Sequence, residues 1–328
     1  MPEAAIIGNT TWGNTLAALL SSKGIIVKLW ARSEAEVEEL KREAHSYSST
    51  NHIEEAMAGA SLVIWVVPSQ KLRQNVIVTR NYLTGSMILM SAAKGLEVDS
   101  GKRMSQVMAE EISPSLRRQI CVLSGPNLAK EIGQGLPAAS MVAAEDVAVA
   151  ERARDLMNSP KFLLFTTDDV VGVELGGALK NIVALGAGMI DGLGLGDNAK
   201  AAFITWSWTE VASLGVALGA KADTFYGLAG LGDLIATCAS ALSRNHYVGY
   251  ELAKGRSLKE ISASMSQVAE GVYTTTAVHQ LAQKLNLEVP IANLIYGVLF
   301  ENFPAAAAWA DFSELTKSGY EPSLDALR

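Results

Sequence analysis

The stretch Ala4-Ala-Ile-Ile-Gly-Asn-Thr-Thr-Trp-Gly13 joins a short apolar run to two glycines, and it decides the fold of the first half. Residues 15–23 then have helical apolar spacing and end at Gly24, where a helix C-cap belongs. A strand, a glycine turn and a helix in this order direct free backbone N–H groups and the positive end of the helix dipole at one point. Such a turn is typical of proteins that bind the pyrophosphate of a dinucleotide.

This fingerprint departs from its usual form at Thr10, which takes the place of the middle glycine. That glycine normally lets the backbone approach the pyrophosphate, so we expect the threonine side chain to crowd the approach. On its own the motif is weak, because a tight turn in another α/β protein would show the same residues.

Apolar runs alternate with helix-prone segments through the next hundred residues, including a charged helix expected at residues 34–43. We expect strands at residues 4–8, 25–30, 62–67, 86–91 and 120–123. This alternation predicts a parallel, doubly wound sheet whose ligands bind at the carboxyl ends of the strands. The informative ends carry Gly8, Arg32, Lys94 and Gly125.

After about Thr166 the character changes, because Ala-, Gly- and Leu-rich segments with helical spacing dominate. We predict an α/β N-terminal Rossmann-type dinucleotide-binding domain at residues 1–166, followed by an all-α substrate-binding and catalytic domain at residues 167–328. The most apolar stretch, residues 182–195, is interrupted by glycines and Asp191. It is too short to span a bilayer, and we expect a buried helix.

The composition narrows the class of protein. The chain has 328 residues, of which 49% are apolar, so it can bury a large core. A net charge of −7 argues against a general surface for nucleic acid or anionic membranes. Cys121 and Cys238 lie far apart and indicate neither a disulfide framework nor a metal site. The N-terminus lacks the pattern of a signal peptide, and we expect a protein of the reducing cytoplasm.

The block Trp12-Gly13-Asn14-Thr15-Leu16-Ala17 resembles the opening of bacterial NAD(P)-dependent glycerol-3-phosphate dehydrogenases, and further blocks follow in the family's order and approximate spacing. In the first half they are Ala93-Lys-Gly-Leu-Glu97, Leu123-Ser-Gly-Pro126, Ala129-Lys-Glu131 and Gly135-Leu-Pro137. In the second half they are Glu174-Leu-Gly-Gly-Ala-Leu-Lys-Asn181, Ala229-Gly-Leu-Gly-Asp233 and Ser243-Arg-Asn245. The resemblance covers nearly the whole chain. It implies interconversion of sn-glycerol 3-phosphate and dihydroxyacetone phosphate, a role in supplying lipid precursors, and a homodimer.

The resemblance makes Lys180 the catalytic residue that transfers the proton. Its neighbours are Leu, Gly and Ala, so we expect the ammonium to lie in a poorly solvated pocket. Desolvation and nearby cations lower a lysine pKa from about 10.4 toward neutrality, as a base for an alcohol proton requires. From the residue alone, a lysine that extends to the surface remains an alternative.

The resemblance also implies the binding residues, among which arginine and lysine suit phosphate groups. For substrate they are Lys94, Gly125, Asn127, Lys180, Asp233, Ser243, Arg244 and Asn245. For cofactor they are Gly8, Thr11, Trp12, Gly13, Arg32, Lys94, Ala129, Arg244, Val268 and Glu270.

Several of these residues have plain structural alternatives. Lys94 and Arg244 suit solvated surface charges, Glu270 suits a surface turn, and Asp233 suits a helix cap. Asn181 either orients substrate or packs in its helix. Lys130 matches a lysine of the family, and we assign it no role. No metal spacing links the histidines, for which we expect surface positions: His45, His52, His246 and His279.

The strand at residues 25–30 does not end in an acid, whereas an NAD-selective site commonly has Asp or Glu there. Arg32 can pair with a 2′-phosphate and Ser33 can add a hydrogen bond, so we expect NADP or NAD, with NADP slightly favoured. A carboxylate of Glu34 or Glu36 turned into the pocket would invert this preference.

Two further departures from the family pattern accompany Thr10. Thr205-Trp206-Ser207 stands where Thr-Arg-Gly is expected, and Trp206 and Trp208 suit either an oligomer contact or core filling. Residues 46–51 are polar where an Asn/Pro-rich loop is usual. These departures keep open a degenerate paralogue that binds cofactor without turnover. A related β-hydroxyacid or opine-type dehydrogenase, which shares a dinucleotide domain followed by a helical domain, is the other alternative.

Overall fold

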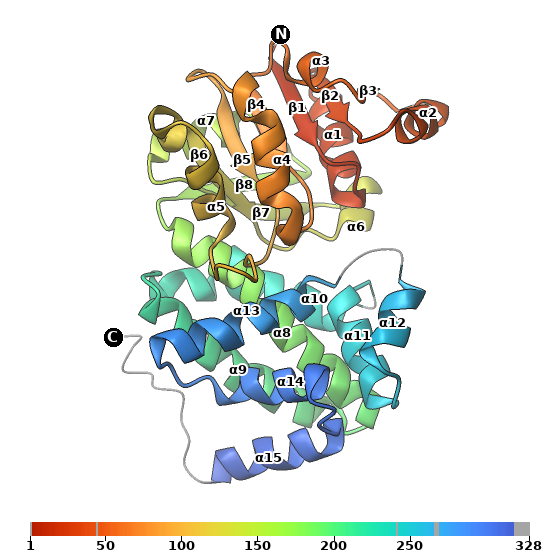
Figure 1. Ribbon diagram of the computed structural model, residues 1–328, viewed down its shortest axis with the longest axis vertical. Coiled ribbons are helices and arrows are strands. Elements are labelled where there is room, and N and C mark those ends of the chain that lie inside the picture. Colours follow the sequence, from red (N-terminus) through yellow and green to blue (C-terminus); the bar gives the residue numbers. More distant parts are fainter. Residues whose placement is uncertain (1, 44, 241, 266–268, 318–328) are drawn as a thin grey trace. The chain divides into compact units, whose positions relative to one another are not determined.

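The computed structural model describes residues 2–43, 45–240, 242–265 and 269–317 (Figure 1). The chain forms two compact units. The first consists of Met1–Lys94 and Met104–Val173, and the second of Gly95–Arg103 and Glu174–Arg328. A short hairpin early in the sequence therefore belongs to the second unit.

The first unit contains an eight-stranded sheet of order β3-β2-β1-β4-β5-β6-β7-β8. Its strands are β1 Glu3–Ile7, β2 Ile26–Trp30, β3 Ser48–Thr50, β4 Leu62–Trp65, β5 Ile88–Ser91, β6 Ile120–Ser124, β7 Ala138–Ala143 and β8 Phe162–Thr167. The first six strands pair in parallel, in the strand order that is characteristic of dinucleotide-binding sheets. The predicted Rossmann-type fold is confirmed.

Helices cover both faces of this sheet (Figure 1). They are α1 Thr11–Ser22, α2 Glu34–Arg42, α3 Ile53–Met57, α4 Leu72–Thr79, α5 Met104–Glu111, α6 Ala129–Gly133 and α7 Val147–Met157. The position of strand β1 between helices on both faces explains why its sequence is continuously apolar. Ala4 and Ile6 pack in a cluster with α1, α2 and α7, whereas Ala5 and Ile7 pack in another with α3, α4 and α5.

The last two strands depart from the predicted sheet. β7 runs antiparallel to β6, so the expectation of a wholly parallel sheet is wrong there. β8 pairs in parallel with β7 at the edge, where Phe162 and Leu164 are buried while Leu163 and Phe165 are exposed. The polar strand β3 at the opposite edge was also not predicted, because a strand of Ser and Thr has no apolar run.

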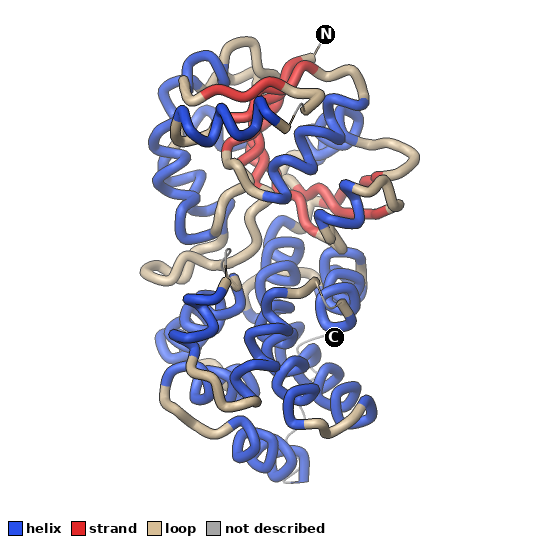
Figure 2. Tube along the Cα trace, turned by 90° about the vertical axis from the view of Figure 1, so that its right-hand side faces the viewer, coloured by secondary structure: helices blue, strands red, loops and turns tan. Residues whose placement is uncertain are grey.

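From residue 170 onward the described part of the chain is built of helices, which confirms the predicted all-α second half (Figure 2). They are α8 Val170–Leu193, which begins at the end of the first unit, α9 Asp197–Ala217, α10 Asp233–Ala239, α11 Arg244–Ala253, α12 Leu258–Ser264, α13 Glu270–Leu285, α14 Pro290–Phe300 and α15 Ala305–Lys317.

Helix α8 is the most apolar element of the second half. Of the described helices it alone has the length and hydropathy to cross a membrane, and 94% of its most apolar 18-residue window is buried inside the protein. The predicted buried helix is confirmed, and it is longer than the apolar stretch at residues 182–195 because it begins at Val170.

Candidate active site

The turn between β1 and α1 leaves no room for side chains at its two glycines. Gly8 has φ +124°, and a Cβ added there would lie 2.6 Å from the Val66 carbonyl oxygen. A Cβ added to Gly13 would lie 2.3 Å from the Gly8 carbonyl oxygen. The turn is therefore a backbone cradle at the start of a helix, which fits a dinucleotide pyrophosphate.

Thr10 is the N-cap of α1. Its hydroxyl accepts a hydrogen bond from the Gly13 N–H at 3.0 Å and donates one to the Val66 carbonyl oxygen at 3.0 Å. Helix α1 consequently begins at Thr11, four residues before the predicted start. Both hydrogen bonds hold the hydroxyl within the protein and tie the turn to the end of β4.

The other predicted residues near this turn differ in what they expose. Thr11 is exposed at the first position of α1, whereas Trp12 packs edge-to-face on Phe162 with ring centroids 6.2 Å apart. Trp12 therefore has its indole in the core and offers a ligand the backbone of the first helical turn. Ala129 begins α6, and its carbonyl oxygen accepts a hydrogen bond from Thr15 Oγ1 at 3.3 Å.

Arg32 follows β2 with an exposed side chain. Its backbone N–H donates to Glu36 Oε2 at 2.9 Å, and Ser33 Oγ caps α2 by accepting from the Glu36 N–H. Glu34 Oε2 accepts from Asn51 Nδ2 at 3.5 Å. The Glu36 carboxylate therefore folds back on the turn after β2, whereas the Glu34 carboxylate contacts the residue that follows β3.

A polar group follows the ends of β5 and β6. Lys94 Nζ donates to the Gly125 carbonyl oxygen at 2.7 Å, and Ser140 Oγ donates to Asn127 Oδ1 at 2.5 Å. Two buried atoms here, Asn127 Nδ2 and Ser124 Oγ, have no hydrogen-bond partner among the described residues. Because buried donors are nearly always paired, the Asn127 amide is a strong candidate to donate to a ligand.

In the second unit Lys180 is buried, with 6% of its surface exposed. Its Nζ donates to Asp233 Oδ1 and, at 2.6 Å, to Thr237 Oγ1. The predicted poorly solvated pocket is therefore present, and the surface alternative is wrong. The charged group in contact with Nζ is the Asp233 carboxylate.

Close packing of backbones brings Asp233 to Lys180. Gly176 lies one helical turn before Lys180, and a Cβ added to it would lie 2.7 Å from the Ala229 carbonyl oxygen. The turn Leu228–Gly232 can therefore rest on α8, and Asp233 follows as the first residue of α10. The N-cap of α10 is Gly232, so the alternative role of Asp233 as a cap is not what the structure shows.

The predicted asparagines join three helices. Asn245 Nδ2 donates to Asn181 Oδ1 at 2.8 Å, and Asn245 Oδ1 accepts from the Gly271 N–H at 2.9 Å. Helices α8, α11 and α13 are thereby tied together beside Lys180. Ser243 is the N-cap of α11, where its Oγ accepts from the His246 N–H at 3.2 Å.

Arg244 is the first residue of α11 and keeps an exposed side chain. Surrounding protein atoms partly desolvate the guanidinium and lower its pKa below the usual value, whereas the Glu270 carboxylate acts in the opposite direction. Arginine still stays charged at neutral pH, so this exposed cation can meet an anionic group. Glu270 begins α13, and Val268 lies outside the described residues.

Comparison with known proteins covers both units. The family models for the N-terminus and C-terminus of NAD-dependent glycerol-3-phosphate dehydrogenase match residues 3–150 and 169–310. A glycerol-3-phosphate dehydrogenase [NAD(P)+] of Dehalococcoides mccartyi is 51% identical over 315 residues, covering 92% of this chain and 88% of the relative. The chain belongs to the NAD-dependent glycerol-3-phosphate dehydrogenase family.

Other members of this family agree in sequence and in fold. A glycerol-3-phosphate dehydrogenase [NAD(P)+] of Geobacter sulfurreducens is 42% identical over 315 residues, covering 92% of this chain and 94% of the relative. A crystal structure of glycerol-3-phosphate dehydrogenase from Coxiella burnetii has a TM-score of 0.89 at 32% identity, covering 95% of this chain and 99% of that one. The resemblance predicted from the sequence blocks is confirmed.

Within this glycerol-3-phosphate dehydrogenase family member, the structure adds a residue that the sequence analysis missed. Thr237 is buried, and its hydroxyl accepts from Lys180 Nζ and donates to the Asp233 carbonyl oxygen at 2.7 Å. A signal was present, because Thr237 lies four residues after Asp233 and therefore on the same face of a helix.

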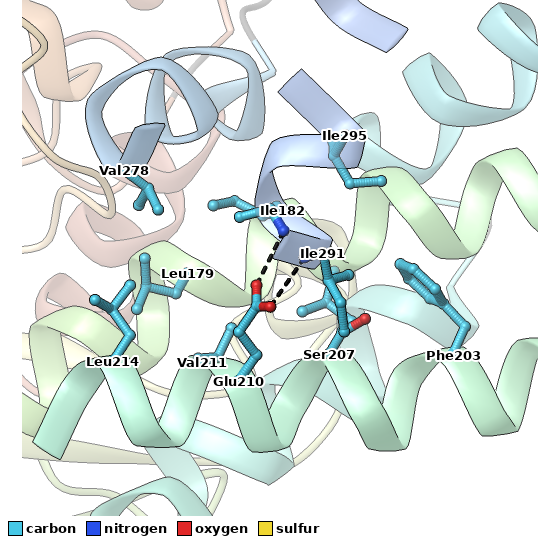
Figure 3. A pocket seen from close by; sticks show the side chains of 12 residues that line it. Leu179, Ile182, Phe203, Ser207, Glu210, Val211, Leu214, Val278, Ile291 and Ile295 are labelled. Atoms are coloured by element: carbon cyan, nitrogen blue, oxygen red, sulfur yellow. Dashed lines mark hydrogen bonds between the residues drawn. The ribbon is translucent and has the colours of Figure 1, made fainter. Parts of the chain in front are cut away.

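Of the departure Thr205-Trp206-Ser207 the structure buries Ser207, whereas Thr205 is exposed and Trp206 is half-buried. Trp208 is buried, and its Nε1 donates to the Phe225 carbonyl oxygen at 3.1 Å, so core filling is what this tryptophan does. Ser207 and Glu210 line a small apolar cavity, where the Glu210 carboxylate accepts from the N-terminal N–H groups of α14 (Figure 3). The cavity volume of about 20 Å³ has room for a water molecule but not for a phosphorylated triose.

Proposed function

We propose that the chain is an NAD(P)-dependent sn-glycerol-3-phosphate dehydrogenase that interconverts sn-glycerol 3-phosphate and dihydroxyacetone phosphate. The observation that carries the proposal is the buried cluster of Lys180, Asp233 and Thr237 in a chain of this family. Supply of glycerophospholipid precursors in the cytoplasm, by a homodimer, belongs to the same proposal.

Lys180 transfers the proton in this proposal. During oxidation its amine takes the proton of the C2 hydroxyl, while the C2 hydride leaves to the cofactor, and reduction reverses both transfers. Asp233 and Thr237 hold Nζ from two directions, which limits its motion relative to the substrate. The nicotinamide supplies the hydride chemistry when the cofactor is bound.

The remaining polar groups bind and orient. Arg244 combines an exposed guanidinium with the N-terminal end of α11, where the helix dipole also favours an anion, so it suits the substrate phosphate. Lys94 and the unpaired Asn127 amide suit oxygen atoms of substrate or cofactor.

The cradle at Gly8 and Gly13 fits the cofactor pyrophosphate, and Arg32 fits a 2′-phosphate. Glu36 accepts the backbone N–H of Arg32, which keeps a carboxylate beside that cation. We infer that both NADP and NAD bind and that NADP is slightly favoured, because the exposed Arg32 guanidinium can pair with a 2′-phosphate, while the Glu36 carboxylate is bonded to the Arg32 backbone N–H and limits that preference.

The test is a spectrophotometric assay of NADH and NADPH oxidation with dihydroxyacetone phosphate. Lys180→Ala should lower kcat by about 100-fold or more, the scale of losing positioned acid–base catalysis, and leave cofactor binding intact. The matched control is Lys284→Ala, an exposed lysine on α13, which should be unaffected.

Lys180→Ala leaves the buried Asp233 without its cation, which destabilises the fold. Lys180→Gln is therefore the second variant, because its amide can still donate to Asp233 and cannot act as a base. Near-normal turnover by either folded variant would remove Lys180 from the chemistry. Turnover of a β-hydroxyacid in place of the phosphorylated ketone, or cofactor binding with no turnover, would instead favour the alternatives.

A further inference from the structure

His246 lies in the first turn of α11, two residues after Arg244, and it contacts α8. Its Nε2 is 2.7 Å from Asp191 Oδ2, and the two side chains are 19% and 25% exposed. The other Asp191 oxygen accepts from Lys200 Nζ at 2.9 Å. The expected surface position of His246 is thus wrong, because the ring is mostly covered and bonded to a second helix.

Asp191 is a stable acceptor for this contact. Burial alone would raise the pKa of its carboxyl, but the hydrogen bonds from His246 and Lys200 outweigh burial and hold the pKa below its usual value. The carboxylate therefore stays ionised across the neutral range, and the His246 ring can donate to it in either protonation state.

The backbones of α8 and α11 meet beside this pair. A Cβ added to Gly188 would lie 2.0 Å from the His246 carbonyl oxygen, and one added to Gly249 would lie 1.9 Å from the Leu185 carbonyl oxygen. Glycines on both helices therefore permit a close crossing, in which small displacements of α11 meet backbone atoms of α8.

Two polar contacts join the same helices around the crossing: Asn181 with Asn245, and Asp191 with His246. Helix α8 carries Lys180 and helix α11 begins with Arg244. We propose that His246 is a positioning residue that, through Asp191, fixes the first turn of α11 on α8 and so holds Arg244 in register with Lys180. This inference rests on the proposed function, in which Arg244 binds the substrate phosphate.

The inference makes a specific kinetic prediction. Without the His246 ring the first turn of α11 gains freedom, so the phosphate is bound less well. Lys180 is held by Asp233 and Thr237, both of which lie on α10. His246→Ala should therefore raise KM for dihydroxyacetone phosphate by about 3- to 10-fold, the scale of one lost hydrogen bond, and leave kcat within about twofold.

A double-mutant cycle with Arg244→Ala distinguishes positioning from a general structural role. If His246 acts through Arg244, His246→Ala should raise KM in the wild-type background and have no effect in the Arg244→Ala background. His246→Gln, whose amide can donate to Asp191, should restore most of the loss. Equal effects in both backgrounds, or a fall in kcat at constant KM, would overturn the proposal.

His45→Ala is the matched control, because His45 also lies 2.8 Å from a carboxylate, that of Glu43, but belongs to the first unit. It should leave KM unchanged. If His246→Ala does not fold, Asp191→Asn serves as the second variant. It keeps an oxygen acceptor but loses the charge, and it should give a smaller rise in KM that is again lost in the Arg244→Ala background.

Failure of this inference can be told apart from failure of the proposed function. The proposed function fails if the wild-type protein does not turn over dihydroxyacetone phosphate. Amide hydrogen exchange in the protein without ligands then still tests positioning: His246→Ala should speed exchange in the first turn of α11, whereas His45→Ala should not. Unchanged exchange there would overturn the role of His246.

Discussion

Thr237→Val tests whether the hydroxyl beside Lys180 takes part in turnover. Valine has nearly the shape of threonine, so the change removes one oxygen atom without opening a cavity. In the wild type this oxygen accepts from Lys180 Nζ at 2.6 Å and donates to the Asp233 carbonyl oxygen at 2.7 Å. The substitution therefore removes one of the contacts that we propose to hold Nζ during proton transfer.

The magnitude follows from the burial of both groups. Lys180 and Thr237 are each 6% exposed, so water cannot easily replace the lost partner. A hydrogen bond to a charged group contributes about 1.5–3 kcal/mol, and about 1.36 kcal/mol of activation free energy changes a rate tenfold. If the contact is needed throughout the reaction, kcat should fall by about 10- to 150-fold.

The assay is steady-state oxidation of NADPH with dihydroxyacetone phosphate, accompanied by thermal melting to verify that each variant folds. Thr237→Ser keeps the hydroxyl and should remain within about threefold of the wild-type kcat. A Thr237→Val enzyme within twofold of wild type would refute the reasoning. So would a serine variant that loses as much activity as the valine variant, because the loss would then come from packing.

Three further substitutions test other parts of the structure. Arg32→Ala should weaken NADPH binding more than NADH binding in fluorescence titrations, and equal losses would exclude a 2′-phosphate contact. Thr10→Ala should lower the free energy of unfolding by about 1–2 kcal/mol in urea, because it removes a helix cap, while Thr10→Ser should not. Gly249→Ala should destabilise by about 1–3 kcal/mol, because its methyl group would meet the Leu185 carbonyl oxygen. Gly85→Ala, with no described atom within 4 Å, should melt like the wild type, and equal melting of both alanine variants would contradict the close crossing.

The sequence predicted the interior strands of the first unit well, because these strands are buried on both faces. In β1, successive residues Ala4, Ala5, Ile6 and Ile7 alternate between two core clusters, which forces every position to be apolar. At the sheet edges that constraint is absent. Strand β3 is polar and produces no apolar run. Strand β8 does have an apolar run at Phe162–Phe165, but only Phe162 and Leu164 are buried, whereas Leu163 and Phe165 are exposed.

The sequence predicted that Lys180 is buried, but it did not predict which residue contacts it. The apolar neighbours of Lys180 indicated burial, but its partner Asp233 is 53 positions away, and no local spacing encodes that distance. The pair forms because Gly176 lets a distant turn rest on α8. Contacts made by backbone approach between remote segments depend on the packed fold, which a single sequence does not reveal.

The departures from the family pattern bear on whether the site has lost its activity. Thr10 has φ −127°, a conformation that any residue can adopt, so a glycine is not required there. Its hydroxyl makes two hydrogen bonds, one that caps α1 and one that ties the turn to the end of β4. Ser207 lies on the buried face of α9 beside a small cavity. The Thr10 change therefore serves local structure, and the buried contacts of Lys180 with Asp233 and Thr237 are formed. A degenerate paralogue would be free to lose that costly buried charge pair, so its presence favours an enzyme that still uses it.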